Sequence, residues 1–110
     1  MEVILFRSKL TPEAGDDYIK TDQMLEDMVK SNPGFVDVKS YKAADGERLT
    51  IVWVRDAESL REWRNLAEHR AAQEKGREKW YQFYKMDVAT VTRSTSFDGK
   101  TKERVVKTHS

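Results

Sequence analysis

The middle of the chain has the pattern of a β-hairpin, and this feature constrains the fold most. The stretch FVDVKSYK, residues 35–42, alternates in hydropathy, and LTIVWV, residues 49–54, is rich in β-branched and aromatic residues. Asp45-Gly46 lies between them, and Asp-Gly is one of the strongest short signals for a hairpin turn. The sequence therefore predicts two antiparallel strands in the centre of the chain.

The segment before the hairpin predicts a strand followed by a helix. Residues 3–6, VILF, form an apolar run typical of a strand that is buried on both faces. Thr11-Pro12 predicts the start of the helix, because a threonine hydroxyl can cap it and proline is tolerated at its first position. The residue before Pro33 is disfavoured in the α region, so we expect the helix to end around Ser31-Asn32.

The segment after the hairpin predicts a helix followed by a strand. Asp56 can cap the second helix through its carboxylate, and Leu60, Trp63 and Ala67 then form an apolar stripe along it. The run from about Tyr84 to Phe97 is rich in Val and Thr and predicts the last strand. The complete order is strand, helix, strand, strand, helix, strand.

This βαββαβ order predicts an α+β, ferredoxin-like domain, with two helices on one face of an antiparallel sheet. The other face has no cover within the chain. We expect the strands that carry Ile51, Trp53, Val88 and Val91 to place apolar side chains on this face, which would be costly to expose to water. This favours a homodimer in which a second copy covers the face.

Length and composition limit the class of protein. The 110 residues fit one domain, which we place at residues 1–97, followed by a flexible polar tail over residues 98–110. Twenty basic and nineteen acidic side chains leave a net charge of +1, without the basic excess that favours nucleic acid or an anionic membrane. The first ten residues hold no signal-peptide or membrane-spanning pattern, so we expect a cytoplasmic protein.

Four short motifs resemble the antibiotic biosynthesis monooxygenase (ABM) family, and the resemblance spans about residues 2–97. They are Pro33-Gly34-Phe35, the pattern Asp-x-x-Ser-Leu-x-x-Trp that begins at Asp56, the pattern His-x-x-x-Gln that begins at His69, and Gly-Arg-x-x-Trp-Tyr that begins at Gly76. The resemblance implies a dimeric α+β barrel, in which two ferredoxin-like sheets face each other and each protomer holds a pocket between its own sheet and helices.

The resemblance also implies a candidate activity. The fold family includes cofactor-independent oxygenases of aromatic compounds, haem-degrading enzymes and proteins without known activity. A cofactor-independent monooxygenase acting on an aromatic or quinol-type small molecule is the function we expect. Such a protein binds, deprotonates and desolvates a substrate that itself reacts with oxygen. The alternative is a non-catalytic dimeric module that binds a small hydrophobic ligand or a partner.

Two residues are candidates for catalysis, and each has a structural alternative. His69 could act as a general base, or it could be a surface or helix-cap residue between Glu68 and Arg70. Arg93 could neutralise a phenolate or a superoxide-like oxygen, or it could point into water or form an interface ion pair.

Four aromatic residues are candidates for binding the substrate. Trp63 could form one wall of the pocket or fill the core. Trp80 and Tyr84 could close the pocket, pack in the core or cross the dimer interface, where Trp and Tyr are enriched. Tyr18 would face the same interior from the first helix.

The sequence lacks residues that haem, metal and nucleotide cofactors require for binding. The haem-degrading members use an Asn on the first strand and a His about ten residues after the tryptophan, but here no Asn lies between Val3 and Leu10, and Gln73 takes the His position. The two histidines, His69 and His109, form no metal-binding spacing, and cysteine is absent. No glycine-rich nucleotide-binding motif is present.

Overall fold

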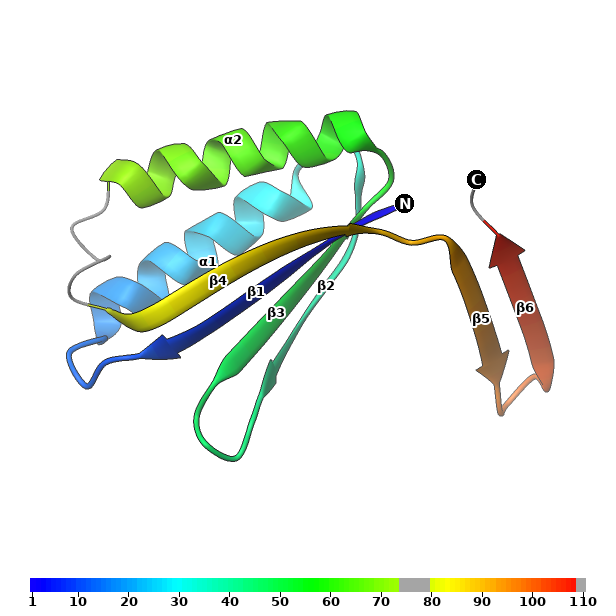
Figure 1. Cartoon of the computed structure of the whole chain (residues 1–110), viewed down its shortest axis with the longest axis horizontal. Helices are drawn as coiled ribbons and strands as arrows, with labels where there is room; N and C mark the ends of the chain where they lie inside the picture. Colours follow the sequence, from blue (N-terminus) through cyan, green and yellow to red (C-terminus); the bar gives the residue numbers. More distant parts are fainter. Residues whose placement is uncertain (74–79, 109–110) are drawn as a thin grey trace.

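A four-stranded antiparallel sheet in the order β2-β3-β1-β4 carries both helices on one face (Figure 1). The computed structural model describes residues 1–73 and 80–108, and the side chains of residues 17, 21, 25 and 66–73 lie outside this description. In chain order the elements are β1 Glu2–Leu10, α1 Asp16–Lys30, β2 Phe35–Lys42, β3 Arg48–Val54, α2 Ala57–Gln73, β4 Tyr81–Thr90, β5 Arg93–Asp98 and β6 Glu103–Thr108. The first six elements confirm the predicted ferredoxin-like α+β fold.

The core lies between the sheet and the helices. Ile4 of β1 pairs with Val52 of β3, and both are buried together with Val54. Val29 of α1 and Leu60 of α2 complete this cluster from the helix side. Because successive side chains of a strand point to opposite faces, these positions define the helix-covered face.

The first helix begins later than the sequence predicts. Thr11 donates its backbone N–H to the carbonyl of Trp80, with an N–O distance of 2.7 Å, and its own carbonyl accepts the N–H of Ala14. Thr11 and Pro12 therefore lie in a connection tied to the start of β4, and the expected helix start at this point is wrong. Gly15 is the N-cap, and the helix ends at Lys30 as expected from Pro33.

The other predicted turns and caps are confirmed. Gly46 has φ of +92°, a left-handed conformation that favours glycine, in the loop between β2 and β3. Asp56 Oδ1 accepts the backbone N–H of Ser59 at 2.8 Å, and this hydrogen bond is the main cause that lowers the pKa of the Asp56 carboxyl.

Gly34 joins β2 to the start of α2 through close contacts. Its N–H donates to Asn32 Oδ1, and its carbonyl accepts the N–H of Arg55 at 2.7 Å. The Asn32 side chain also donates to the Ser59 carbonyl. A Cβ added at Gly34 would overlap the Cβ and Oγ of Ser59, which is buried. This close approach explains why a glycine stands in the Pro-Gly-Phe motif.

Gly34→Ala should destabilise the protein by about 1–3 kcal/mol, because the added methyl group forces β2 and α2 apart. Urea unfolding followed by circular dichroism measures this loss. Gly99→Ala is the matched control, since nothing lies within 4 Å of a Cβ built there. The double variant Gly34→Ala/Ser59→Gly should recover part of the loss. Equal stability of Gly34→Ala and the parent would contradict this packing.

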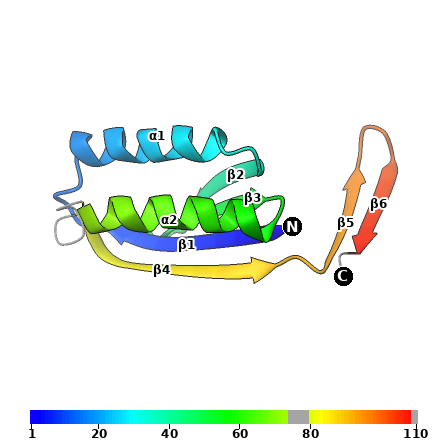
Figure 2. The same ribbon diagram turned by 90° about the horizontal axis from the view of Figure 1, so that it is seen from above.

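The last part of the chain forms two strands where the sequence predicts one strand and a tail. β4 ends at Thr90, and β5 pairs with β6, Arg93 opposite Thr108 and Asp98 opposite Glu103. The Asp98 side chain accepts the N–H of Lys100, which forms the turn of this hairpin. The single strand over residues 84–97 is therefore wrong, and β6 occupies residues 103–108 of the predicted tail, residues 98–110. The hairpin protrudes from one end of the sheet (Figures 1 and 2).

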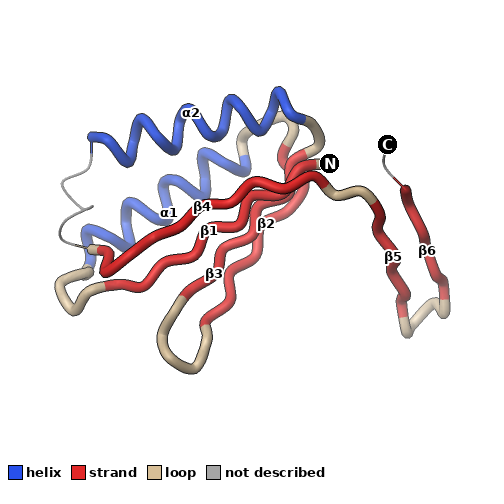
Figure 3. Tube along the Cα trace, viewed as in Figure 1, coloured by secondary structure: helices blue, strands red, loops and turns tan. Residues whose placement is uncertain are grey.

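The face of the sheet opposite the helices is uncovered by any described element of the chain (Figures 2 and 3). Val3 pairs with Trp53 and Leu5 with Ile51 on this face, and apart from Val3 they remain partly exposed. Val88 pairs with Ile4, so it lies on the helix-covered face, and the prediction that it lines the uncovered face is wrong. Val91 follows β4 and donates its backbone N–H to the Met1 carbonyl, so it lies outside the sheet strands.

Candidate functional site

An aromatic cluster joins α1 to the β1 and β4 strands at one end of the sheet. The Tyr18 ring of α1 lies 5.7 Å from Trp80 and 6.0 Å from Tyr81, centroid to centroid, and both contacts are edge-on. Phe6 of β1 stacks on Tyr84 at 5.8 Å and meets Tyr81 at 6.1 Å. Tyr18 and Trp80 are each only 8% exposed. The cluster forms a continuous aromatic wall under the first helix.

Arg48 brings a positive charge to this wall. It is the first residue of β3, and its Nη1 donates to the Tyr18 hydroxyl at 3.2 Å. Its guanidinium carbon lies 6.0 Å from the centroid of the same ring. Arg48 pairs with Ser8 of β1 and Lys42 of β2, so alternation places it on the helix-covered face. A guanidinium fixed beside phenol groups can stabilise negative charge on a bound oxygen.

The buried Tyr18 and the half-buried Tyr81 remain neutral near neutral pH. Burial raises the pKa of the Tyr18 hydroxyl, and the nearby Asp22 carboxylate raises it further, whereas Arg48 lowers it. Burial also raises the pKa of Tyr81, with added contributions from Tyr18 and Asp22. Both hydroxyls can therefore donate a hydrogen bond, but neither is suited to act as a base.

Asp22 is the acidic member of this group. Burial is the main cause that raises the pKa of its carboxyl, and Glu26 adds to the effect, while the positive charge of Arg48 opposes it. The folded protein therefore holds the Asp22 proton to a higher pH than the unfolded chain does. As a consequence, deprotonation of Asp22 lowers the stability of the fold.

The Asp22→Asn variant should show this cost as a function of pH. In the parent, the Asp22 contribution to the free energy of unfolding should fall as pH rises from the unfolded pKa through the raised folded pKa, and should stay low above it. Asp22→Asn removes this loss, so its stability relative to the parent should rise across that range. Urea unfolding at a series of pH values measures the difference, with Asp16→Asn, at the start of the same helix, as the control. A parent that gains stability relative to Asp22→Asn on raising pH would contradict the assigned direction.

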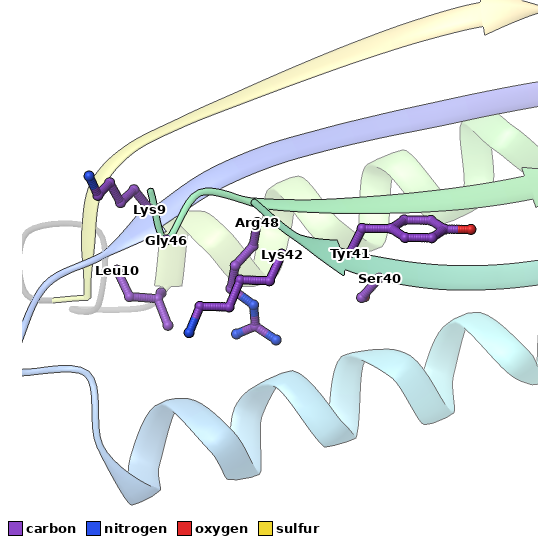
Figure 4. Close-up of a pocket in the computed structure, with 7 residues that line it drawn as sticks. All are labelled: Lys9, Leu10, Ser40, Tyr41, Lys42, Gly46 and Arg48. Atoms are coloured by element: carbon purple, nitrogen blue, oxygen red, sulfur yellow. The ribbon is translucent and has the colours of Figure 1, made fainter. Parts of the chain in front are cut away.

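A pocket of about 440 Å³ opens next to Arg48 (Figure 4). Its lining comes from the ends of β1, β2 and β3 and from the loop between β2 and β3. Figure 4 shows the side chains of Leu10, Lys42 and Arg48 on the α1 side of these strands, whereas Lys9 points away. The volume lies within the range of small-molecule sites. The lining residues are Lys9, Leu10, Ser40, Tyr41, Lys42, Gly46 and Arg48.

Three of the predicted aromatic site residues come together in the structure. Tyr18, Trp80 and Tyr84 belong to the same cluster, although Tyr84 is 41% exposed. Trp63 instead is partly buried against the Ile4, Val29, Val52, Val54 and Leu60 core. This packing supports its structural interpretation, and a role for Trp63 in the wall of the pocket remains a prediction.

The structure describes the side chain of only one of the two predicted catalytic residues. His69 lies on α2, but its side chain is outside the described residues, and so is that of Gln73; Gly76 lies in the undescribed residues 74–79. Arg93 is exposed at the start of β5, a strand that pairs with β6 and not with the four-stranded sheet. The described chain therefore does not bring Arg93 to the aromatic cluster.

Sequence reasoning did not select Arg48, Tyr81 or Asp22. Arg48 directly precedes the apolar run LTIVWV, and in a strand it shares a face with Thr50 and Val52. A basic residue in phase with buried positions was the available signal. Tyr81 ends the Gly-Arg-x-x-Trp-Tyr motif and was considered together with Trp80 and Tyr84, but it was not among the selected site residues. Asp22 carried no comparable signal, because its role depends on the approach of α1 to Arg48 of β3.

The part of the chain that the structure describes contains neither a cluster of metal ligands nor a membrane-spanning helix. Within residues 1–73 and 80–108, His, Cys, Asp and Glu side chains form no group of three that could hold a metal ion. No described helix combines the length and the apolar character needed to cross a membrane.

Comparison with known proteins assigns the family. The chain is 33% identical over 96 residues to YqjZ of Bacillus subtilis, an uncharacterised protein, covering 87% of this chain and 84% of YqjZ. It is 32% identical over 96 residues to the jasmonate monooxygenase ABM of Pyricularia oryzae, covering 86% of this chain and 45% of that protein. The chain belongs to the ABM family. No family model matches the chain.

A solved structure supports the fold of this ABM protein. SnoaB of Streptomyces nogalater, a cofactor-independent oxygenase solved as a mutant, superposes with a TM-score of 0.63. The match covers 82% of this chain and 91% of SnoaB at 14% identity, so it shows the fold alone. The chain spans less than half of the length of the jasmonate monooxygenase.

Proposed function

We propose that this ABM protein is a cofactor-independent monooxygenase that oxidises an aromatic or quinol-type small molecule in the space between its sheet and its helices. The observation that carries the proposal is the aromatic cluster of Tyr18, Trp80 and Tyr81. Arg48 donates a hydrogen bond to the Tyr18 hydroxyl and also lines an open pocket. The names of two similar proteins, a jasmonate monooxygenase and a cofactor-independent oxygenase, agree with this class of reaction.

In the proposed reaction, His69 removes a proton from a hydroxyl of the substrate. Because the pKa values of Tyr18 and Tyr81 are raised, these tyrosines act as hydrogen-bond donors and the base must come from elsewhere. The electron-rich phenolate then reacts with dioxygen. A dihydroxyarene plus dioxygen gives a hydroxyquinone plus water, so the substrate supplies all the electrons and no external reductant is needed. Arg48 would stabilise the negative charge on the substrate oxygen.

We also propose that the working unit is a homodimer. Leu5, Ile51 and Trp53 lie on the uncovered face of the sheet, and they are large apolar side chains that remain partly exposed in one protomer. A second copy would remove this surface from water. Arg93, on the protruding β5–β6 hairpin, could act at a site only where this hairpin meets another protomer.

A non-catalytic ligand-binding module is the second candidate. It is favoured by one observation: neither tyrosine of the aromatic cluster is suited to act as a base, since the pKa values of both are raised. Oxygen uptake with dihydroxyarenes in the absence of added metal or flavin separates the two candidates. The enzyme consumes oxygen above the spontaneous rate, whereas the module binds the aromatic compound without consuming oxygen.

A further inference from the structure

We propose that the pocket beside Arg48 binds a carboxylate of the ligand, so that the preferred substrate is an aromatic carboxylic acid. The proposal rests on the proposed function only in taking this ligand to be the substrate. It goes beyond that function by naming an anionic group that the reaction itself does not require.

The charges that line the pocket carry this inference. Among the described residues that line it, three side chains are cationic, Lys9, Lys42 and Arg48, and none is acidic. Lys42 and Arg48 are paired residues of β2 and β3, and both extend toward α1 over the opening (Figure 4). Two cations on one side of a pocket attract an anion and repel a cation.

The acidic side chains near this end of the sheet have other partners. Glu47 forms an ion pair with Arg7 at 2.6 Å, and Asp45 accepts the backbone N–H of Glu47. Asp22 is an acidic group whose charge interacts with Arg48, but it does not line the pocket. Positive charge therefore exceeds negative charge among the described residues of the lining.

The geometry of Arg48 suits a carboxylate. Its side chain is partly buried, and a hydrogen bond from Nη1 to the Tyr18 hydroxyl fixes its orientation. A guanidinium has five N–H donors in a planar fork, so Arg48 keeps donors for a bidentate contact with a carboxylate. Leu10 lines the same pocket on the α1 side, and the apolar body of an aromatic acid can pack against it.

Calorimetric titration with 2-naphthoate and with 2-naphthamide tests the inference, because these ligands have nearly the same shape and differ in charge. The parent protein should bind 2-naphthoate at least about tenfold more tightly than 2-naphthamide, as expected for a charge-assisted bidentate contact. Arg48→Gln should bring the ratio close to one by weakening the binding of naphthoate alone. Lys42→Gln should reduce the ratio less, since lysine offers a point charge without the fork.

Lys20→Gln is the matched control, because Lys20 is exposed on α1 and does not line the pocket. Melting curves verify folding, and if Arg48→Gln is unfolded, Arg48→Lys replaces it and should still lower the ratio. Equal binding of both ligands by the parent, binding of neither, or an unchanged preference in the Arg48 variant would overturn the inference. Because calorimetry does not depend on turnover, a preference for naphthoate without oxygen uptake would refute the proposed function alone. Oxidation of neutral dihydroxyarenes without the preference would refute this inference alone.

Discussion

His69→Ala should slow the oxidation of 1,4-dihydroxynaphthalene by roughly a hundredfold or more, the usual contribution of a general base. The proposed role of His69 is to take the hydroxyl proton that Tyr18 and Tyr81 cannot take, because the pKa values of both are raised. An imidazole has an ordinary pKa near neutrality, so it can accept this proton under the conditions of the assay. Initial rates of oxygen uptake, corrected for spontaneous oxidation, measure the effect.

The chain offers a matched control for this variant. His109→Ala makes the same substitution at the second histidine, in the last two residues of the chain, and should keep the rate of the parent. Both variants should melt at the temperature of the parent. A folded His69→Ala protein with full activity would show that His69 is structural, and the non-catalytic module would then be the better account.

Ile51→Asp should convert the dimer into a monomer at micromolar concentration. Ile51 lies opposite Leu5 on the face of the sheet that no described element covers. In the proposed dimer its side chain is buried against the second copy, and an unpaired carboxylate placed there costs several kcal/mol, on the order of a whole domain's margin of stability. Sedimentation velocity of the parent and the variant measures the change in mass.

Ile19→Asp is the control for this substitution, because Ile19 is 63% exposed on α1, on the opposite side of the molecule. It should leave the mass at twice that of the chain. A parent protein that sediments as a stable monomer would contradict the dimer directly. A dimer that survives Ile51→Asp would place the interface elsewhere, and the β5–β6 hairpin, with its exposed Phe97, would be the next surface to test.

The order of the elements was predictable because each signal was local. Asp45-Gly46 forms the predicted hairpin turn, and Asp56 forms the predicted helix cap. Each depends on hydrogen bonds to residues only a few positions away in the sequence. The start of α1 was not predictable from Thr11-Pro12, because the Thr11 N–H bonds to Trp80, almost seventy residues away in the sequence. Likewise, the hairpin of β5 and β6 depends on a turn at Asp98 within a stretch whose polar composition is typical of a tail.

The candidate site was predictable only in part. Tyr18 was selected because it would face the interior from the first helix, and Trp80 because it belongs to one of the family's motifs; the two residues do contact each other. Arg48 was missed because its position in phase with the buried residues of β3 indicates the face it lies on but not its contact with Tyr18 of α1. The arginine selected instead, Arg93, was placed on the same strand as Val88, whereas the structure ends that strand at Thr90.

The proposed activity requires that this ABM protein insert an oxygen atom into an aromatic substrate without a cofactor. Oxidation of 1,4-dihydroxynaphthalene under oxygen-18 gas, by protein freed of metals with a chelator, follows that atom directly. We expect 2-hydroxy-1,4-naphthoquinone carrying one oxygen-18 atom, with the second atom released as water. Unlabelled naphthoquinone formed at the rate of the protein-free control would contradict the proposed activity.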